Sequence, residues 1–387
     1  MNISDPAERF AAKTAALETS FRLPLVSVVV VNYNYGRFLD QVVDSIFQQT
    51  YPNVECIVVD NASTDDSPRV LAAIAARYPQ CVVIRRASND GQTPAALDGL
   101  EACGGHYVIF MDADDVLLPQ AVEMHMFTHL SMRVHVGFTS GDMLQAVDDQ
   151  IVLSTGEELN RYIRSGKGLK RNVFRPYRHV FDAPWPSKSI ARSLPKKIHY
   201  VPSLSNQWVW SPTSGTCYRR DALRLFADNP GLRTLRTGTD MYFACAIGAL
   251  CGSAIIDEPV FIYRLHGANV FSRRPQLNHC NGVDIGGIGD QNHQSYLLAV
   301  DHLVANARRF CASGPFRAHY AALLMRVDCR DEDRNLPRWQ RRSRAARRII
   351  EHYPSVAAAL GTGLTLALLF WFRVPLGVIA AAVRGRK

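Results

Sequence analysis

The stretch "LVSVVVVNYN", Leu25–Asn34, is a run of β-branched residues that ends in polar ones. A continuous apolar run of this length is typical of a strand covered on both faces, as in a parallel sheet. Three later stretches have the same character: "VECIVVD" (Val54–Asp60), "CVVIRRA" (Cys81–Ala87) and "HYVIFMD" (His106–Asp112). The sequence therefore predicts four buried strands in its first third.

Segments with helical spacing of apolar residues separate these strands. Gly36–Gln49 is followed by Ser63–Pro79, which opens with Ser, Thr and Asp residues suited to capping a helix. A third helix is expected over Pro94–Cys103, and Pro119 suits the first turn of a fourth. Strands that alternate with helices predict right-handed β-α-β units, and so an α/β fold with a mostly parallel sheet flanked by helices.

Composition narrows the class of protein. The chain has 387 residues, of which 47% are hydrophobic and 20% charged, with a formal net charge of +9. The basic residues gather late, in Arg338–Arg348 and Arg384–Lys387. Nine cysteines without Cys-x-x-Cys spacing predict neither a zinc site nor a disulfide framework, but free thiols in a reducing compartment. No nucleic-acid-binding motif accompanies the basic residues, so we expect no nucleic-acid partner.

The N-terminal segment and the loop after the first strand argue against further classes of protein. Residues 1–22 contain no apolar core of a secretory signal, so we expect a loose helical arm and a catalytic region that stays in the cytoplasm. "NYNYGRF" (Asn32–Phe38) replaces the G-x-G-x-x-G of dinucleotide-binding folds, and no P-loop motif occurs. Dinucleotide oxidoreductases and P-loop enzymes are therefore disfavoured.

Acidic residues follow two of the predicted strands. Ligands of such sheets bind beyond the carboxyl ends of the strands, where Asp60 and Asp112 stand. Asp112, Asp114 and Asp115 crowd into four residues, so a positive charge should neutralise them. A D-x-D spacing suits Mg²⁺ or Mn²⁺ bridging a diphosphate. The alternative is that these acids only cap the next helix.

Two longer segments carry a family resemblance. "QQTYPNVECIVVDNASTDDS" (Gln48–Ser67) and "HYVIFMDADD" (His106–Asp115) resemble motifs of the family 2 glycosyltransferases, which have the Rossmann-like GT-A fold. The resemblance is strong over residues 25–130 and moderate over 205–270. It implies transfer of a sugar from a nucleoside diphosphate sugar with inversion at the anomeric carbon, assisted by Mg²⁺ or Mn²⁺.

The resemblance also implies roles for the acids. Asp60 matches the aspartate that binds the nucleotide base, Asp112 would lie near the ribose and the metal, and Asp114 would be a metal ligand. Asn32 and Asn34, at the exit of the first strand, can supply polar contacts to the nucleotide. Their alternative is an ordinary turn, since Asn is common in turns.

The segment "RTGTDMYFACAIG" matches the place of the family's catalytic base. Asp240 would take the proton from the acceptor hydroxyl. Thr239 stands where the family often has Glu, which weakens the match. The alternative is that Asp240 is a first-turn acid, which the helix dipole favours.

Further residues are implied downstream. In "IYRLHGANVFS", His266 would be a metal ligand or phosphate contact, and Arg264 would meet the diphosphate. In "SPTSGTCYRR", Arg219 or its neighbour would lie near phosphate or acceptor. Trp210, with Trp208 just before it, would stack on a sugar or lipid, or else pack in the core.

One position departs from the family. In "NDGQTPAALDG" (Asn89–Gly99), Leu97 replaces an Asn of the usual pattern. This substitution puts the identity of the donor in question rather than the class of reaction.

The C-terminal tail is apolar. Ser355–Phe372 contains 18 residues without a charge, the lower limit for spanning a bilayer, and basic residues flank it. A single span, a re-entrant or interfacial helix pair, and a buried helical hairpin all fit this pattern.

These inferences divide the chain into four parts. They are an N-terminal arm (1–22), a GT-A catalytic domain (23–270) with a nucleotide-sugar half (23–130) and an acceptor half (131–270), a helical extension with a basic segment (271–350), and an apolar membrane-associating tail (351–387).

The predicted protein is an inverting, metal-dependent glycosyltransferase at the cytoplasmic face of the cell membrane. Its acceptor would be a hydroxyl of a saccharide or lipid-linked saccharide in cell-envelope polysaccharide synthesis. Two alternatives stay open: a metal-dependent nucleotidyltransferase, which should carry a glycine-rich phosphate loop that is not seen, and a catalytically inactive sugar-nucleotide-binding module. The oligomeric state is not predicted.

Overall fold

The structure is a computed structural model. It describes residues 22–168, 172–178, 185–205, 207–267, 269, 275, 288–311, 314–330 and 335–385. All but the last residue of the predicted N-terminal arm, and much of the first part of the predicted helical extension, lie outside the described residues.

The first third of the chain forms the four predicted strands, and they are parallel in the order β3-β2-β1-β4. They are β1 (Val26–Asn32), β2 (Val54–Asp60), β3 (Val82–Arg85) and β4 (Tyr107–Asp112). The helices between and after them are α2 (Gly36–Phe47), α3 (Ser67–Arg77), α4 (Gln92–Ala102) and α5 (Ala121–Ser131). The sequence-based prediction of β-α-β units is therefore confirmed here.

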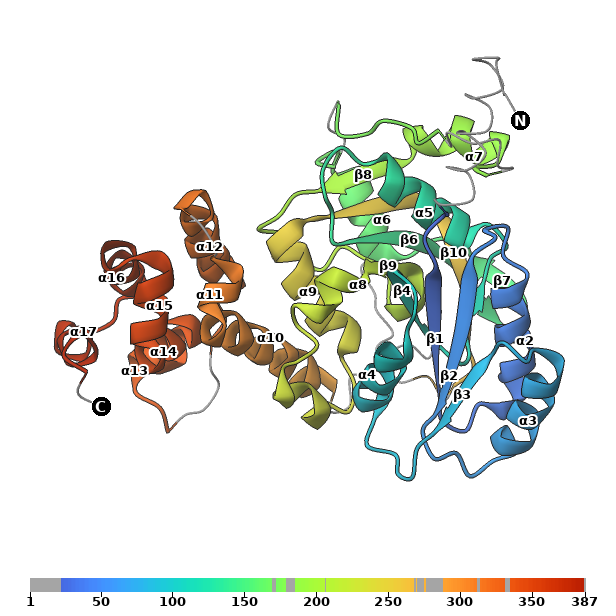
Figure 1. The fold of residues 1–387 in the computed structure, drawn as a ribbon, viewed down its shortest axis with the longest axis horizontal. Coiled ribbons are helices and arrows are strands. Elements are labelled where there is room, and N and C mark those ends of the chain that lie inside the picture. Colours follow the sequence, from blue (N-terminus) through green and yellow to red (C-terminus); the bar gives the residue numbers. More distant parts are fainter. Residues whose placement is uncertain are drawn as a thin grey trace, which may run out of the picture.

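Alternate side chains of β1 point to opposite faces of this sheet and are buried on both. Val28 and Val30 pack with α2 and α3, whereas Val29 packs with α4, and all three are fully buried. Figure 1 shows α2 and α3 on one side of β1 and β2, with α4 on the other. Helices on both faces explain why the strand is apolar throughout rather than alternating.

The second half of the sheet is mixed rather than parallel. It contains β5 (Val116–Leu117), β6 (Phe138–Val147), β7 (Gln150–Leu153), β8 (Ile198–Val201), β9 (Thr216–Arg219) and β10 (Ser253–Leu265). The order continues as β4-β9-β6-β10-β5, with β7 beside β6 and β8 beside β10. β9 is antiparallel to both β4 and β6, and β10 is parallel to β6. The sheet is therefore mixed but mostly parallel, as predicted, and every antiparallel pair involves a strand of the second half.

The reversal at β9 has a local cause. The chain reaches the carboxyl edge of β4 in the 3-10 turn η2 (Thr213–Gly215), where the Ser214 hydroxyl accepts a hydrogen bond from the Asp112 backbone N–H at 3.1 Å. It then enters β9 from that edge, so it must run against β4. The shorter helices of this half are α6 (Glu157–Arg164), α7 (Lys188–Ser193) and α8 (Arg220–Arg224), with 3-10 turns η1 (Leu194–Lys196) and η3 (Pro230–Thr234).

The C-terminal helices pack on the sheet-containing region through α9 (Thr239–Cys251). They are α10 (Ile288–Ala305), α11 (Ala307–Phe310), α12 (Gly314–Val327), α13 (Arg338–Arg342), α14 (Arg344–Glu351), α15 (Tyr353–Leu360), α16 (Thr362–Trp371) and α17 (Leu376–Val383). Figure 1 shows α10 leading from the sheet to the rest of this group at one end of the molecule.

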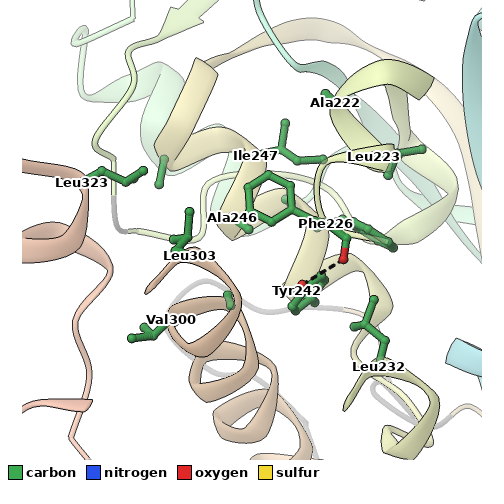
Figure 2. Packing of buried hydrophobic residues seen from close by; sticks show 14 of the residues in the cluster. Ala222, Leu223, Phe226, Leu232, Tyr242, Ala246, Ile247, Val300, Leu303 and Leu323 are labelled. Atoms are coloured by element: carbon green, nitrogen blue, oxygen red, sulfur yellow. Dashed lines mark hydrogen bonds between the residues drawn. The ribbon is translucent and has the colours of Figure 1, made fainter. Parts of the chain in front are cut away.

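One apolar cluster crosses that junction (Figure 2). Ala246 and Ile247 of α9 belong to the same buried cluster as Val300 and Leu303 of α10. The Tyr242 hydroxyl within it donates to a backbone carbonyl oxygen at 3.1 Å, so this polar atom is satisfied inside the core. The start of the C-terminal region therefore shares a hydrophobic core with the sheet-containing region.

The apolar tail is broken near its middle. Gly361, with φ of 88°, separates α15 from α16, and the two helices are bent by 116°. Among the described residues no single helix is both long and apolar enough to cross a bilayer, although this bent pair meets the test when taken together. The positive φ of Gly361 thus ends α15 and separates it from α16.

Candidate active site

Hydrogen bonds tie the exits of β1 and β2 to each other. The Asn32 amide donates to Asp60 Oδ1 at 3.0 Å and to the Ser63 hydroxyl at 3.1 Å. Asn34, with φ of 61°, accepts from the Thr64 backbone N–H at 2.7 Å. Asn32 is fully buried. Its contacts are therefore those of a turn residue that holds the backbone in place, which was the alternative to a nucleotide contact. They set the shape of the edge beyond both strands.

The strand register brings Asp60 and Asp112 to one edge. Asn32 pairs with Asp60 across β1 and β2, and Val31 pairs with Asp112 across β1 and β4. Neighbouring strands lie about 4.8 Å apart, so the two aspartates start roughly 10 Å apart in the sheet. Asp60 and Asp112 thus lie at the same edge of the sheet, but Asp60 lines neither of the two cavities found there.

A cavity of about 360 Å³ opens beyond this edge, and we call it the Tyr33 cavity. It is lined by residues that come mainly from strand exits: Val31, Tyr33, Tyr35, Asn61, Asn89, Gln92, Asp112, Ala113, Asp114, Arg236, Thr237, Tyr263 and Asn269. Aromatic rings and amides next to two carboxylates can surround a ligand that has both a flat base and a charged group.

A second cavity, of about 270 Å³, lies beside the first, and we call it the Trp208 cavity. Its lining residues come from many elements: Gln92, Asp112, Met143, Gln145, Gly156, Glu158, Leu159, Trp208, Trp210, Ser211, Pro212, Thr213, Asp240, Met241, Tyr263 and Asn292. Gln92, Asp112 and Tyr263 line both cavities. Asp112 therefore stands in the wall where ligands of the two cavities would meet.

Burial and neighbouring charges raise the pKa of two acids at the end of β4, Asp112 and Asp115. Burial, and then the charges of Asp114 and Asp240, raise the pKa of Asp112 to about 7. Burial followed by its neighbours Asp114 and Asp112 raises the pKa of Asp115 well above its usual value. The Gln92 amide donates to Asp112 Oδ1 at 2.5 Å and opposes the rise. A cluster of this kind gains from a bound cation.

Asp240 lies in the first turn of α9 and lines the Trp208 cavity. Its Oδ1 accepts from the Met241 backbone N–H at 2.7 Å. Burial is the main cause that raises the pKa of its carboxyl above the usual range. The sequence offered two interpretations of Asp240, a catalytic base and a first-turn acid favoured by the helix dipole. Its position is compatible with both, because a first-turn acid at a cavity wall can also act as a base.

Asp114 and His266 are in contact. His266 Nε2 lies 2.9 Å from Asp114 Oδ2, and the rings of Tyr35 and Phe38 each lie 5.4 Å from the imidazole. The other ring nitrogen of His266, Nδ1, is buried without a hydrogen-bond partner among the described residues. His266 lies at the carboxyl edge because it is the first residue after the end of β10.

These residues fit a hard divalent cation. Within the described ranges, no group of three or more Asp, Glu, His or Cys side chains forms a ready cage. Mg²⁺ rarely needs such a cage, since one or two carboxylates with substrate phosphates and water complete its shell. The donor chemistry of Asp112, Asp114 and His266, with the raised pKa of Asp112, suits that arrangement.

Arg264 is turned toward α2. Its guanidinium lies 4.8 Å from the centre of the Phe38 ring, donates to the Gln41 side chain, and lies 3.8 Å from Asp149. It lines neither cavity, whereas its backbone N–H donates to Asp115 Oδ1 at 3.4 Å. The predicted diphosphate contact does not match this placement, because ring stacking and Gln41 occupy the guanidinium.

Arg219 lies at the opposite edge of the sheet. It pairs with Tyr107 across β9 and β4, so the length of β4 separates it from Asp112. Its guanidinium donates to the Asp221 carboxylate, at 3.0 Å from Nε. The predicted phosphate or acceptor contact is therefore corrected: antiparallel pairing carries the end of β9 away from the acids.

The two tryptophans differ in accessibility. Trp210 is 2% exposed, and its indole N–H donates to the Ser253 hydroxyl at 2.8 Å, so most of this ring is core. Trp208 is half-buried and meets it edge to face, with ring centres 5.6 Å apart. Both line the cavity, but Trp208 offers the more open ring.

Sequence reasoning missed several cavity residues, above all Arg236. This exposed arginine lines the Tyr33 cavity, and no acidic partner among the described residues neutralises its guanidinium. A signal was available, because Arg236 stands four residues before Asp240, in the segment that matches the family's catalytic base. Glu158 and Asn292 carried no such signal.

Comparison with known proteins identifies the family of one part of the chain. Residues 27–138 match the model of the family described as "Glycosyl transferase family 2". Residues 27–138 therefore form a glycosyl transferase family 2 region. The match includes all four parallel strands and the D-x-D acids, which are the parts that carried the resemblance in the sequence.

Curated relatives are glycosyltransferases by name. An uncharacterized glycosyltransferase of Nostoc sp. is 28% identical over 247 residues, which are 63% of this chain and 66% of that protein. A Bacillus subtilis protein named for teichuronic acid biosynthesis is 30% identical over 146 residues, 38% of this chain and 55% of its own length. The chain thus spans less than two thirds of these relatives.

Two solved structures resemble the chain at low identity. Residues 1–349 of S. aureus TarS in complex with UDP give a TM-score of 0.46 at 14% identity, covering 94% of this chain and 92% of that one. The Pyrobaculum calidifontis mannosyltransferase PcManGT, in complex with GDP-Man and Mn²⁺, gives 0.39 at 18% identity, covering 98% and 95%.

Proposed function

We propose that this family 2 glycosyltransferase binds a nucleoside diphosphate sugar in the Tyr33 cavity and a saccharide acceptor in the Trp208 cavity. One observation carries the proposal: the two cavities share Asp112 in their common wall, and Asp240 lines the second cavity. A donor whose diphosphate lies at the acids would thereby present its sugar to the acceptor cavity.

Asp240 is the base of the reaction. Its carboxylate takes the proton of an acceptor hydroxyl while that oxygen bonds to the anomeric carbon. The bond from the anomeric carbon to the diphosphate oxygen breaks, and its electron pair leaves with the nucleoside diphosphate. Attack from the face opposite the diphosphate inverts the configuration, so the reaction is an inverting transfer.

Asp112, Asp114 and His266 would hold Mg²⁺ or Mn²⁺ together with the diphosphate. When bound, such an ion offsets the charge that develops on the leaving group. Arg236 lines the same cavity and supplies a second positive charge. Asp60, tied to Asn32, shapes the base-binding end.

The acceptor is a saccharide or lipid-linked saccharide of an envelope polysaccharide, in keeping with a relative named for teichuronic acid biosynthesis. The protein works at the cytoplasmic face of the membrane. Phe370, Trp371 and Leu376 of the tail are exposed, with Arg373 and Arg384 nearby in the chain. Apolar side chains beside arginines suit an anionic lipid surface.

Vesicle sedimentation tests that location. The protein should sediment with phosphatidylglycerol vesicles more than with phosphatidylcholine vesicles, and Trp371→Ala should weaken binding. Ile151→Ala, an exposed residue of β7, is the matched control. Equal recovery in the supernatant with both lipids would remove the membrane from the proposal.

Donor hydrolysis tests the enzyme. Wild-type protein with Mn²⁺ should release the nucleoside diphosphate from one member of a panel of UDP-, GDP- and dTDP-sugars. Asp114→Asn should lower the rate by about 10²-fold or more, because charge stabilisation at the leaving group is lost. Asp66→Asn, a surface acid paired with Arg69, should leave the rate intact.

Three results would contradict the proposal. They are no release from any donor, full activity of the Asp114→Asn variant, and release of pyrophosphate from a nucleoside triphosphate and a sugar phosphate. The last result would support the nucleotidyltransferase alternative instead.

A further inference from the structure

The helix α10 reaches the candidate site from beyond the predicted acceptor half. The Gln291 side-chain oxygen accepts from the Arg236 backbone N–H at 3.1 Å. The Ser295 hydroxyl lies 3.2 Å from the Gly238 carbonyl oxygen and 3.0 Å from the Gln291 carbonyl oxygen, and its one proton can go to either. These two residues are one helical turn apart, so one face of α10 holds the segment that leads into Asp240.

The contact at Gly238 is tight. Gly238 precedes α9 with φ of 89°, and a Cβ placed there would lie 2.8 Å from Ser295 Oγ. Ser295 is fully buried. Glycine is required by the left-handed backbone and by the closeness of α10. The position of Asp240, two residues later, therefore depends on α10.

The same segment contacts the acids of β4. The Arg236 carbonyl oxygen accepts from the Gln92 backbone N–H at 2.6 Å, and the Gln92 side chain donates to Asp112. A continuous set of hydrogen bonds thus runs from Gln291 of α10 through Arg236 and Gln92 to Asp112.

Asn292 lies on α10 between these two anchors and lines the Trp208 cavity. Its side chain is half-buried, and its amide has no hydrogen-bond partner among the described residues. Its Oδ1 lies 3.6 Å from the Cβ position of Gly238, which places the amide near the start of α9 and Asp240. An amide can donate and accept at once, which matches a sugar hydroxyl.

We propose that Asn292 binds a hydroxyl of the saccharide acceptor, and that Ser295 positions Asp240 through Gly238. The proposal rests on the proposed function and adds a residue outside the predicted acceptor half. The acceptor site is then completed by the first helix of the C-terminal region. Acceptor choice depends on a helix that the family match over residues 27–138 does not include.

The test compares transfer with hydrolysis in the full chain. The donor is the nucleotide sugar that the wild type hydrolyses with Mn²⁺, and the acceptors are p-nitrophenyl glycosides of hexoses, N-acetylhexosamines and uronic acids. Asn292→Ala should raise the acceptor KM by about 3- to 10-fold, the effect of removing one neutral hydrogen bond. The ratio of transfer to hydrolysis should fall with it.

Ser295→Ala should act differently. It should lower kcat of transfer more than it raises the acceptor KM, because Asp240 shifts away from the acceptor hydroxyl while Asn292 still binds the acceptor. Gln294→Ala is the matched control, since Gln294 is exposed on the same helix and lines neither cavity. Melting temperatures of all variants separate these effects from unfolding.

The outcomes separate the two proposals. Donor hydrolysis that depends on Asp114, together with an unchanged acceptor KM in Asn292→Ala, would overturn the role of Asn292 and leave the proposed function standing. Failure of the wild type to use any glycoside above the rate of hydrolysis would also overturn this acceptor assignment. A lack of hydrolysis with every donor would overturn both.

Discussion

The Tyr33 cavity and the Trp208 cavity are neighbours, but they are assembled in different ways. Most residues of the Tyr33 cavity come from strand exits within one stretch, from Val31 to Asp114. The Trp208 cavity collects residues from Gln92 to Asn292, on helices, turns and strands. On the proposed assignment, donor recognition would depend mainly on one β-α-β region, with Arg236 added from elsewhere, whereas acceptor recognition would depend on many segments of the chain.

This difference has a physical basis. Parallel strands must end at one edge, so residues that follow them converge whatever the loops do. No comparable constraint brings the residues of the Trp208 cavity together. Its walls depend on the antiparallel insertion of β9 and on the packing of α10 against α9. Substitutions in the two cavities should therefore separate donor use from acceptor use.

The largest effect is expected from Asp240→Asn. Loss of the base should lower kcat of transfer by about 10²- to 10⁴-fold, while the donor KM changes little. Steady-state kinetics with a p-nitrophenyl glycoside measure both. Asp221→Asn, a first-turn acid of α8 at the opposite edge, is the control. A large change in the donor KM of Asp240→Asn would show that donor and acceptor binding are not separate.

Arg236→Ala should act on the Tyr33 cavity. Removing a cation beside a diphosphate should raise the donor KM by about 10- to 100-fold, as expected for a charged hydrogen bond. The acceptor KM should stay close to that of the wild type. Arg233→Ala is matched, because Arg233 lies three residues earlier and pairs with Asp98 on the surface. Equal effects of both variants would reject a phosphate role.

The dependence of the transfer rate on pH should follow the protonation of Asp240 in the Trp208 cavity. Burial raises the pKa of Asp240, so the base becomes protonated at a higher pH than an ordinary carboxyl. Activity should fall about tenfold per unit as pH drops below that pKa, and the fall should begin above the usual aspartate value of about 3.9. Transfer rates at saturating Mn²⁺ between about pH 4 and 9 measure this limb. A flat profile would contradict the assigned base.

The smallest effect is expected from Trp208→Ala. Loss of the half-buried ring should raise the acceptor KM by about 2- to 10-fold, the range of one aromatic contact, and leave the donor KM unchanged. Acceptor titrations provide the measurement, and Trp371→Ala, which removes an exposed ring in the tail, is the control. A donor effect of Trp208→Ala would show that the cavities do not act separately.

Some site residues could be predicted, and others could not, for identifiable reasons. Asp112 ends β4, while Asp114 and His266 come within two residues after β4 and β10, and the structure brings all three to one edge. Arg219 also adjoins a strand, but the direction of β9 was not readable from local pattern, so it was expected at the wrong edge. Arg264 was expected to face phosphate, and the stacking on Phe38 comes from a distant helix.

The tail shows the same limit. Its apolar run was visible in the sequence, and the bend of 116° at Gly361 was not. An isolated glycine inside an apolar helix is often tolerated, so the pattern alone favoured neither a straight nor a broken helix. The positive φ of Gly361 in the folded chain separates the two helices.

By itself the sequence determined the four parallel strands, the helices between them and the acids at their ends, since periodicity and strand direction are local properties with one consistent arrangement. Only the tertiary structure decided that β9 runs against β4, that Arg219 lies away from the acids, and that α10 brings Asn292 beside Asp240. Those outcomes depend on packing between segments far apart in the chain, which no local pattern encodes.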